Sequence, residues 1–156
     1  MRCVKLRNDV KLPEYATQFS AGADIFTPDA FEIKDNETKL IKCGFSVEIP
    51  KTFEIQIRPK SGLALKGITI LNSPGTIDSD YRGEIGVILH KIPVDPGETS
   101  IRFNKDDKIA QMVLCKVEKI YWKEAKKLSN TERGEGGYGS TGRWFNVLPF
   151  IWNCPC

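Results

Sequence analysis

Three side chains in the segment 71–83 could act together on a small ligand. The Asn72 amide could read the edge of a base, and the Tyr81 ring could pack on a sugar. The Asp78 carboxylate could polarise a water molecule. The ordinary alternative is a long hairpin in which Asp78 and Asp80 are turn residues. Taken alone, the segment favours that alternative.

A second candidate is the glycine-rich segment 133–142. Its glycines let backbone N–H groups approach phosphate oxygens closely, and the hydroxyls of Ser140 and Thr141 add donors. Arg133 supplies a planar cation for a phosphate, and Tyr138 a face for stacking a base. A flexible linker is the alternative, but a linker needs neither an arginine nor an aromatic residue. Composition slightly favours a nucleotide-phosphate loop.

Other polar residues are each open to two interpretations. Lys60 and Ser61, at the end of an alternating stretch, form either an ordinary turn or an anion site. Asp24 is either an acid at the end of a strand or an indirect partner of magnesium. Gln111 lies in an apolar run, where it is either buried with its hydrogen bonds satisfied or in contact with a ligand.

The elements expected to position these residues are strands. Apolar and polar residues alternate strictly over Phe53–Arg58, as in a half-buried strand. Further strands are expected at Thr38–Cys43, Ser46–Ile49, Ile68–Leu71, Glu84–His90, Thr99–Phe103 and Lys108–Val117. Only Lys123–Leu128 is weakly typical of a helix. Short strands between frequent Gly and Pro turns predict an all-β sandwich or barrel.

Composition limits the classes of protein to consider. The chain has 156 residues, 40% hydrophobic and 28% charged, which fits one globular domain. A net charge of +3 is too small to indicate nucleic-acid binding, and no signal peptide or membrane span is expected. Five cysteines, an odd number, suggest buried reduced thiols and an intracellular location, and with one histidine, His90, no structural zinc is expected.

The order of the motifs along the chain favours the functional interpretation of these residues over the ordinary one. Five motifs follow one another along the chain: Ala-Gly-Ala-Asp, Lys-Ser-Gly-Leu-Ala, Gly-Thr-Ile-Asp-Ser-Asp-Tyr-Arg-Gly, Lys-Ile-Ala-Gln-Met and Arg-Gly-Glu-Gly-Gly-Tyr-Gly-Ser-Thr-Gly. In sequence and spacing they resemble the five motifs of trimeric dUTPases. The resemblance extends over roughly residues 4–142, and the third and fifth motifs are the most specific.

The resemblance implies a fold, an assembly and a reaction. It implies a jelly-roll-like β subunit in a homotrimer whose active sites are shared between subunits. The reaction is hydrolysis of dUTP to dUMP and pyrophosphate, by Mg²⁺-assisted attack of water on the α-phosphate. This limits uracil in DNA and supplies dUMP for dTMP synthesis. No nucleic acid or membrane partner is implied. The expected parts are a β domain (1–128), a closing arm (129–142) that serves a neighbour's site, and an apolar tail (143–156).

The resemblance also assigns roles to residues. Asp78 is the general base, Tyr81 lies under the deoxyribose and excludes a 2′-hydroxyl, and Asp24 holds magnesium through water. Uracil is read by Asn72 and by the backbone of Gly75, Thr76, Ile77, Asp78 and Gly86. Phosphate contacts are expected from Lys60, Ser61, Gly62 and Gln111. The closing arm contributes Arg133, Gly139, Ser140 and Thr141, with Tyr138 stacked on uracil.

Departures from the family pattern leave questions open. Lys60 stands where the family more often has arginine, which keeps the charge but weakens bidentate contact. Tyr138 replaces the more usual phenylalanine. The tail after Gly142 is outside the pattern, and its apolar residues are expected to dock on the β scaffold. The alternatives are a dCTP deaminase and a catalytically idle module that binds dUTP.

Overall fold

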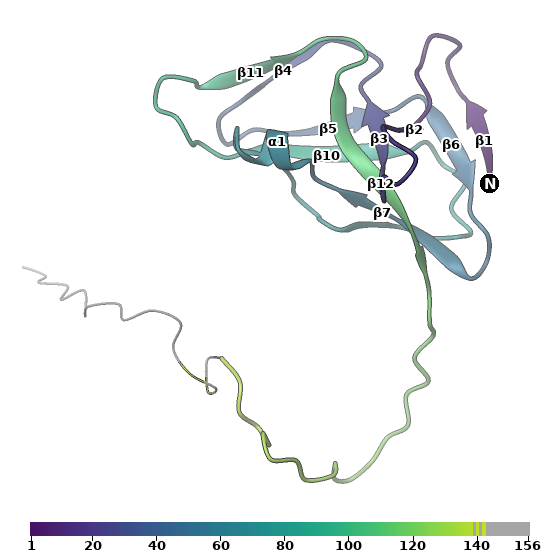
Figure 1. The fold of residues 1–156 in the computed structure, drawn as a ribbon, viewed down its shortest axis with the longest axis vertical. Coiled ribbons are helices and arrows are strands. Elements are labelled where there is room, and N and C mark those ends of the chain that lie inside the picture. The colour runs from purple at the N-terminus through teal and green to yellow at the C-terminus, as the bar shows by residue number, and fades with distance from the viewer. Residues whose placement is uncertain (139, 141, 143–156) are drawn as a thin grey trace, which may run out of the picture. The chain divides into compact units, whose positions relative to one another are not determined.

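The computed structural model describes residues 1–138, 140 and 142, and it divides the chain into two units, 1–119 and 120 onward (Figure 1). All strands of the described residues lie in the first unit. They are β1 (Arg2–Lys5), β2 (Glu14–Tyr15), β3 (Ala23–Phe26), β4 (Phe31–Lys34), β5 (Thr38–Lys42), β6 (Phe45–Glu48), β7 (Phe53–Arg58), β8 (Ile68–Ile70), β9 (Gly75–Ile77), β10 (Gly86–Lys91), β11 (Ser100–Phe103) and β12 (Lys108–Lys116). The only helix in this part of the chain, α1 (Ser61–Ala64), is too short to cross a membrane.

The strands form four antiparallel sheets. The largest has the order β2-β3-β12-β7-β9, and a second has the order β5-β10-β8. The pair β11-β4 lies at one end of the first unit and the pair β1-β6 at the other (Figure 1). The predicted all-β class is therefore confirmed.

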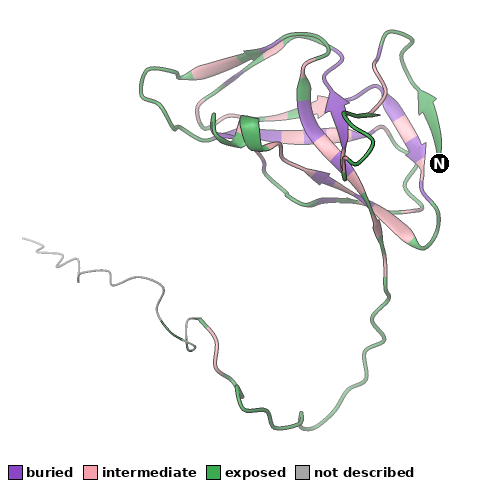
Figure 2. Cartoon of the chain, viewed as in Figure 1, coloured by how far each residue is buried: buried purple, intermediate pink, exposed green. Residues whose placement is uncertain are grey.

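The core lies between the facing sheets and is aliphatic. Figure 2 shows the buried residues on the central strands, and the exposed ones at turns and edges. In β7 the predicted alternation is confirmed, since Ile55 and Ile57 are buried while Glu54, Gln56 and Arg58 are partly exposed. Phe45 of β6 and Val87 and Leu89 of β10, which belong to other sheets, are part of the same cluster.

One buried ion pair fixes β5 beside β10. The side chain of Lys91 is fully buried, and its Nζ lies 2.5 Å from Oδ1 of Asp35. The backbone of Lys91 also pairs with the turn before β5, through Asn36 N–H and Glu37 C=O. A buried ammonium requires such a partner, because an unpaired buried charge is strongly destabilising. The pair therefore holds the β4–β5 turn against the end of β10.

A bulge near the start of β12 changes which side chains share a face. Lys108 pairs with Phe26 and Ala110 with Ile25, so Ile109 is an extra residue. Ile109 and Ala110 are both buried, although adjacent residues of a regular strand face opposite sides. Lys108 and Gln111 consequently lie on the same face of the sheet.

Two sequence-based predictions are wrong. Residues 123–128 are not helical but exposed and without regular structure. So short a segment is marginal as an isolated helix, and packing on other residues is needed to stabilise it. Among the cysteines that the structure describes, the thiol is buried only at Cys43, where burial and the nearby charge of Glu84 raise its pKa to about 12. Cys3 is exposed and Cys115 is partly buried.

Candidate active site

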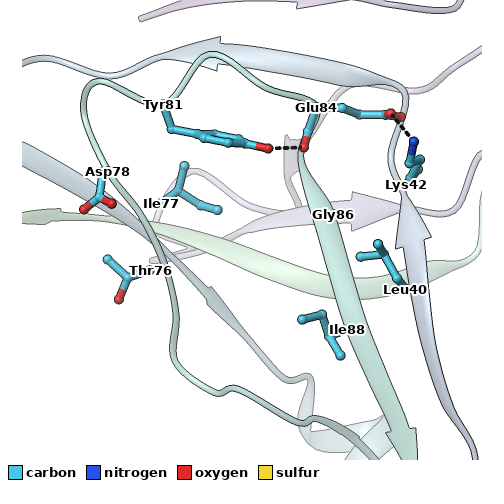
Figure 3. A pocket seen from close by; sticks show the side chains of 9 residues that line it. All are labelled: Leu40, Lys42, Thr76, Ile77, Asp78, Tyr81, Glu84, Gly86 and Ile88. Carbon is cyan, nitrogen blue, oxygen red and sulfur yellow. Dashed lines mark hydrogen bonds and ion pairs between the residues drawn. The ribbon is translucent and has the colours of Figure 1, made fainter.

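A pocket of about 490 Å³ opens where the hairpin after β9 meets β5 and β10 (Figure 3). Two cross-strand pairs form one wall, since Leu40 lies opposite Ile88 and Lys42 opposite Gly86. The lining residues are Leu40, Lys42, Thr76, Ile77, Asp78, Tyr81, Glu84, Gly86 and Ile88. The pocket therefore combines an apolar wall with several charged and hydroxyl-bearing side chains at its edge.

Asp78 lies at the edge of this pocket, directly after β9. Its backbone carbonyl accepts a hydrogen bond from the Tyr81 N–H at 3.2 Å, which closes a tight turn. Its carboxylate is exposed, and no described residue forms a hydrogen bond or ion pair with it. The carboxylate is thus free to accept a hydrogen bond, and then a proton, from a water molecule.

Tyr81 forms the other side of the pocket. Its hydroxyl donates to the backbone carbonyl of Glu84 at 3.0 Å, while 43% of the residue stays exposed. Gly83 lies against the ring, because a Cβ on Gly83 would come within 2.5 Å of the tyrosine Cζ. The ring can therefore offer a flat surface to a ligand in the pocket.

A second cluster gathers three of the sequence-predicted residues, Asp24, Lys60 and Gln111. The Asp24 side chain is 6% exposed and binds two ammonium groups, those of Lys60 and Lys108, the latter at 2.7 Å. Gln111 lies opposite Asp24 and donates from Nε2 to the carbonyl of Pro59 at 2.9 Å. Gln111 thus holds the chain just before Lys60.

The pKa of Asp24 reflects two opposing effects. Burial of the carboxyl raises the pKa, but hydrogen bonds from Lys108 and Lys60 outweigh burial and bring it below the ordinary value of 3.8. Ionised Asp24 therefore stabilises the fold at pH values above that ordinary value. The contribution is lost as the pH falls through the lower pKa of the folded state.

We expect Asp24→Asn to flatten the acid limb of the stability profile. Stability of the unmodified protein should fall more steeply than that of the variant below about pH 4, where the native carboxylate takes up a proton. Thermal unfolding midpoints at equal protein concentration, from pH 7 to pH 3, measure the difference. Asp80→Asn removes an exposed carboxyl with no ion pair among the described residues and serves as the control. Parallel profiles for Asp24→Asn and unmodified protein would contradict this role.

Of the other predicted site residues, some line the pocket and others lie outside it. Thr76, Ile77 and Gly86 line the pocket, whereas Gly75 is buried and Asn72 lies beside it outside the lining. Ser61 and Gly62 are exposed at the start of α1, directly after Lys60.

The glycine-rich arm belongs to the second unit. The Arg133 guanidinium donates through Nε to the Gly136 carbonyl at 2.7 Å, which folds the arm locally. Tyr138 is fully exposed with φ of 48°, and Ser140 closes a turn onto Gly137. The predicted contacts at Gly139 and Thr141, and the predicted docking of the tail 143–156, lie outside the described residues.

Sequence reasoning missed four lining residues: Leu40, Lys42, Glu84 and Ile88. All four belong to strands that were expected, but their periodicity does not reveal which strands become neighbours. The pairing of β5 with β10 brings them to the hairpin. The only signal available beforehand was the position of Glu84, directly after the motif that carries Asp78 and Tyr81.

Known proteins match almost the whole chain. The family model described as dUTPase matches residues 8–142. Deoxyuridine 5'-triphosphate nucleotidohydrolase of Hydrogenobaculum sp. (strain Y04AAS1) is 51% identical over 140 residues, covering 88% of this chain and 94% of that protein. A relative of the same name from Rickettsia bellii (strain OSU 85-389) is 53% identical over 135 residues, covering 85% and 87%.

Solved structures agree with the sequence matches. The dUTPase of Staphylococcus bacteriophage 80alpha with dUPNHPP superposes with a TM-score of 0.80 at 26% identity, covering 91% of this chain and 98% of that one. The fold and the sequence thus lead to one assignment. The chain belongs to the dUTPase family.

Proposed function

We propose that this protein hydrolyses dUTP to dUMP and pyrophosphate, with Asp78 as the general base. The observation that carries the proposal is an exposed, unpartnered Asp78 carboxylate at the edge of a pocket that Tyr81 also lines, in a member of the dUTPase family. A carboxylate in this position can orient a water molecule and take its proton as the water attacks the α-phosphorus. Removal of dUTP would limit uracil in DNA and supply dUMP for dTMP synthesis.

Uracil recognition in this proposal depends on the hairpin around β9. Asn72 and the backbone groups of Gly75–Asp78 and Gly86 would pair with the polar edge of the base. A mispaired base edge leaves buried polar groups unsatisfied, which is costly, so cytosine is rejected. Tyr81 would lie under the deoxyribose and leave no space for a 2′-hydroxyl.

Phosphate binding would use the cluster around Lys60. Its ammonium, the exposed Ser61 hydroxyl and the backbone of Gly62 provide donors, and a Cβ on Gly62 would meet nothing within 4 Å. Open space at a glycine lets an oxygen anion approach the backbone closely. Gln111 is the remaining proposed contact.

Magnesium is part of the proposal, held mainly by the substrate phosphates. Both Asp24 oxygens already bind lysines, and the described residues contain no group of three metal-ligating side chains. These residues fit an ion held through water by Asp24 rather than by direct ligation. When bound to the phosphates, magnesium neutralises charge and makes pyrophosphate a better leaving group.

The assembly and location belong to the same proposal. We propose a homotrimer in which Arg133, Tyr138, Gly139, Ser140 and Thr141 of one subunit close over the site of a neighbour. Closure of a glycine-rich arm would exclude water and complete the phosphate contacts. An intracellular location, cytoplasmic or nuclear, suits an enzyme of nucleotide pools and the free thiols of the described cysteines.

Pyrophosphate release from dUTP, dCTP, dTTP and UTP, compared side by side with magnesium present, tests the function. We expect release from dUTP alone at low enzyme concentration. Ammonia and dUTP formed from dCTP would identify a deaminase instead. Binding of dUTP without release of pyrophosphate would identify an idle module. Either result would refute the proposed hydrolysis.

A further inference from the structure

Glu84 connects the hairpin that carries Tyr81 to the turn between β5 and β6. Its backbone carbonyl accepts the Tyr81 hydroxyl at 3.0 Å (Figure 3). Its Oε1 accepts the Gly44 N–H at 2.9 Å, and its Oε2 lies 3.8 Å from the Lys42 ammonium. One residue therefore contacts the pocket tyrosine through its main chain, and β5 and the turn after β5 through its side chain.

The two side-chain contacts of Glu84 are not equally important. The Lys42 side chain is 73% exposed, and an ion pair at a solvent-exposed group contributes little to stability. The Gly44 amide is different, because a carboxylate that accepts a backbone N–H forms a charge-assisted hydrogen bond. The Gly44 contact is thus the main attachment of the Glu84 side chain.

Glu84 can be altered without removing the surrounding fold. The next residue, Ile85, is fully buried and pairs through its backbone with Cys43 and Phe45, each at 2.9 Å. The strand after Glu84 is therefore fixed independently of the glutamate side chain. What depends on the side chain is the peptide segment between Tyr81 and Ile85, including the carbonyl that receives the tyrosine hydroxyl.

Tyr81 needs such a restraint because it is half exposed. An exposed aromatic side chain retains rotamer freedom, and ordering it on substrate binding costs affinity. Gly83 limits the ring from one side, and the carbonyl of Glu84 holds its hydroxyl. The ring is thereby restrained before a ligand arrives.

We infer that Glu84 is a positioning residue that orients Tyr81 and so supports discrimination between deoxyribose and ribose. The inference rests on the proposed function, because it assigns Tyr81 to the sugar of dUTP. Glu84 itself does not need to touch the nucleotide. Its effect passes through the Tyr81 hydroxyl and the local backbone.

The test compares Glu84→Ala with Glu84→Gln in the full chain. For each variant, the KM for dUTP and the inhibition constant of UTP are measured. We expect Glu84→Ala to lower the ratio of the UTP inhibition constant to the dUTP KM by about 3–10-fold, the range of one net hydrogen bond, with kcat changed less. Glutamine retains an oxygen for the Gly44 N–H, so Glu84→Gln should keep most of the ratio.

A matched control exists at Glu37. Its Oε2 accepts the Lys34 N–H at 2.8 Å, its Oε1 lies 3.1 Å from the Lys39 ammonium, and its side chain is 33% exposed against 26% for Glu84. Glu37 does not line the pocket. Glu37→Ala should therefore affect stability much as Glu84→Ala does but leave the UTP-to-dUTP ratio unchanged.

Gly83→Ala displaces the Tyr81 ring without changing the Glu84 side chain, and so provides an independent test. The new Cβ would lie 2.3 Å from the tyrosine hydroxyl oxygen, so the ring must move. A fall in the ratio comparable to that of Glu84→Ala supports the inference. An unchanged ratio in an active Glu84→Ala protein, or equal loss in Glu84→Ala and Glu84→Gln, overturns it. Absence of dUTP hydrolysis by the unmodified protein refutes the proposed function instead.

Discussion

Asp78→Asn should bind dUTP nearly as well as the unmodified protein but turn it over about 10²-fold more slowly or worse. Asparagine keeps the size of the side chain and loses only the proton acceptor. The fold should be unaffected, because no described residue depends on the carboxylate for a hydrogen bond or ion pair. Steady-state pyrophosphate release gives kcat, and calorimetric titration with dUTP under non-turnover conditions gives binding.

Asp80→Asn is the control for losing one negative charge from the same hairpin. Asp80 is exposed and does not line the pocket that Asp78 shares with Tyr81. Its substitution should leave kcat within a few-fold of that of the unmodified protein, as do most surface changes away from a site. Turnover retained by a folded Asp78→Asn protein would refute the assignment of the base.

Protein that ends at residue 128 should be folded and trimeric but nearly inactive. The first unit contains all strands of the described residues and its own core, so its folding does not require the arm. The truncation removes Arg133, Tyr138, Ser140 and Thr141, the proposed contacts of the closing arm. Circular dichroism measures folding, light scattering measures the oligomeric state, and pyrophosphate release from dUTP measures activity.

Mixing the truncated protein with Asp78→Asn subunits tests whether arms are shared. In a mixed trimer, an intact Asp78 on a truncated subunit can be closed by an intact arm from its neighbour. Partial recovery of activity is therefore expected after subunit exchange, relative to either protein alone. Failure of verified mixed trimers to recover activity would mean that each subunit uses its own arm.

Some strands could be predicted from the sequence, and others could not. Phe53–Arg58 has the predicted bounds because its alternating side chains face core and surface in turn. Ala23–Phe26 was missed because all four residues are buried, which removes the period of two. Arg2–Lys5 was missed for the opposite reason, since all four are exposed.

In the candidate site, too, some residues could be predicted from the sequence and others could not. Asp78 and Tyr81 were found because they are close in sequence and lie within a specific motif. Leu40 and Ile88 were not, because their place in the pocket depends on how β5 and β10 pair. Lys108 is a similar case, since its contact with Asp24 requires the bulge in β12.

The bulge allows two residues, rather than one, to separate Lys108 from Gln111 while both side chains lie on one face. Exchange of Ile109 for another apolar residue leaves the facing of both polar side chains unchanged. Regular pairing of all four residues, without the bulge, would turn either Lys108 or Gln111 toward the core, whereas deletion of Ile109 would leave both opposite their present partners and on one face. Design of variants in this stretch can therefore vary the apolar residues or remove Ile109, but a change that flattens the bulge while all four residues remain would separate Asp24 from one of its neighbours on that face.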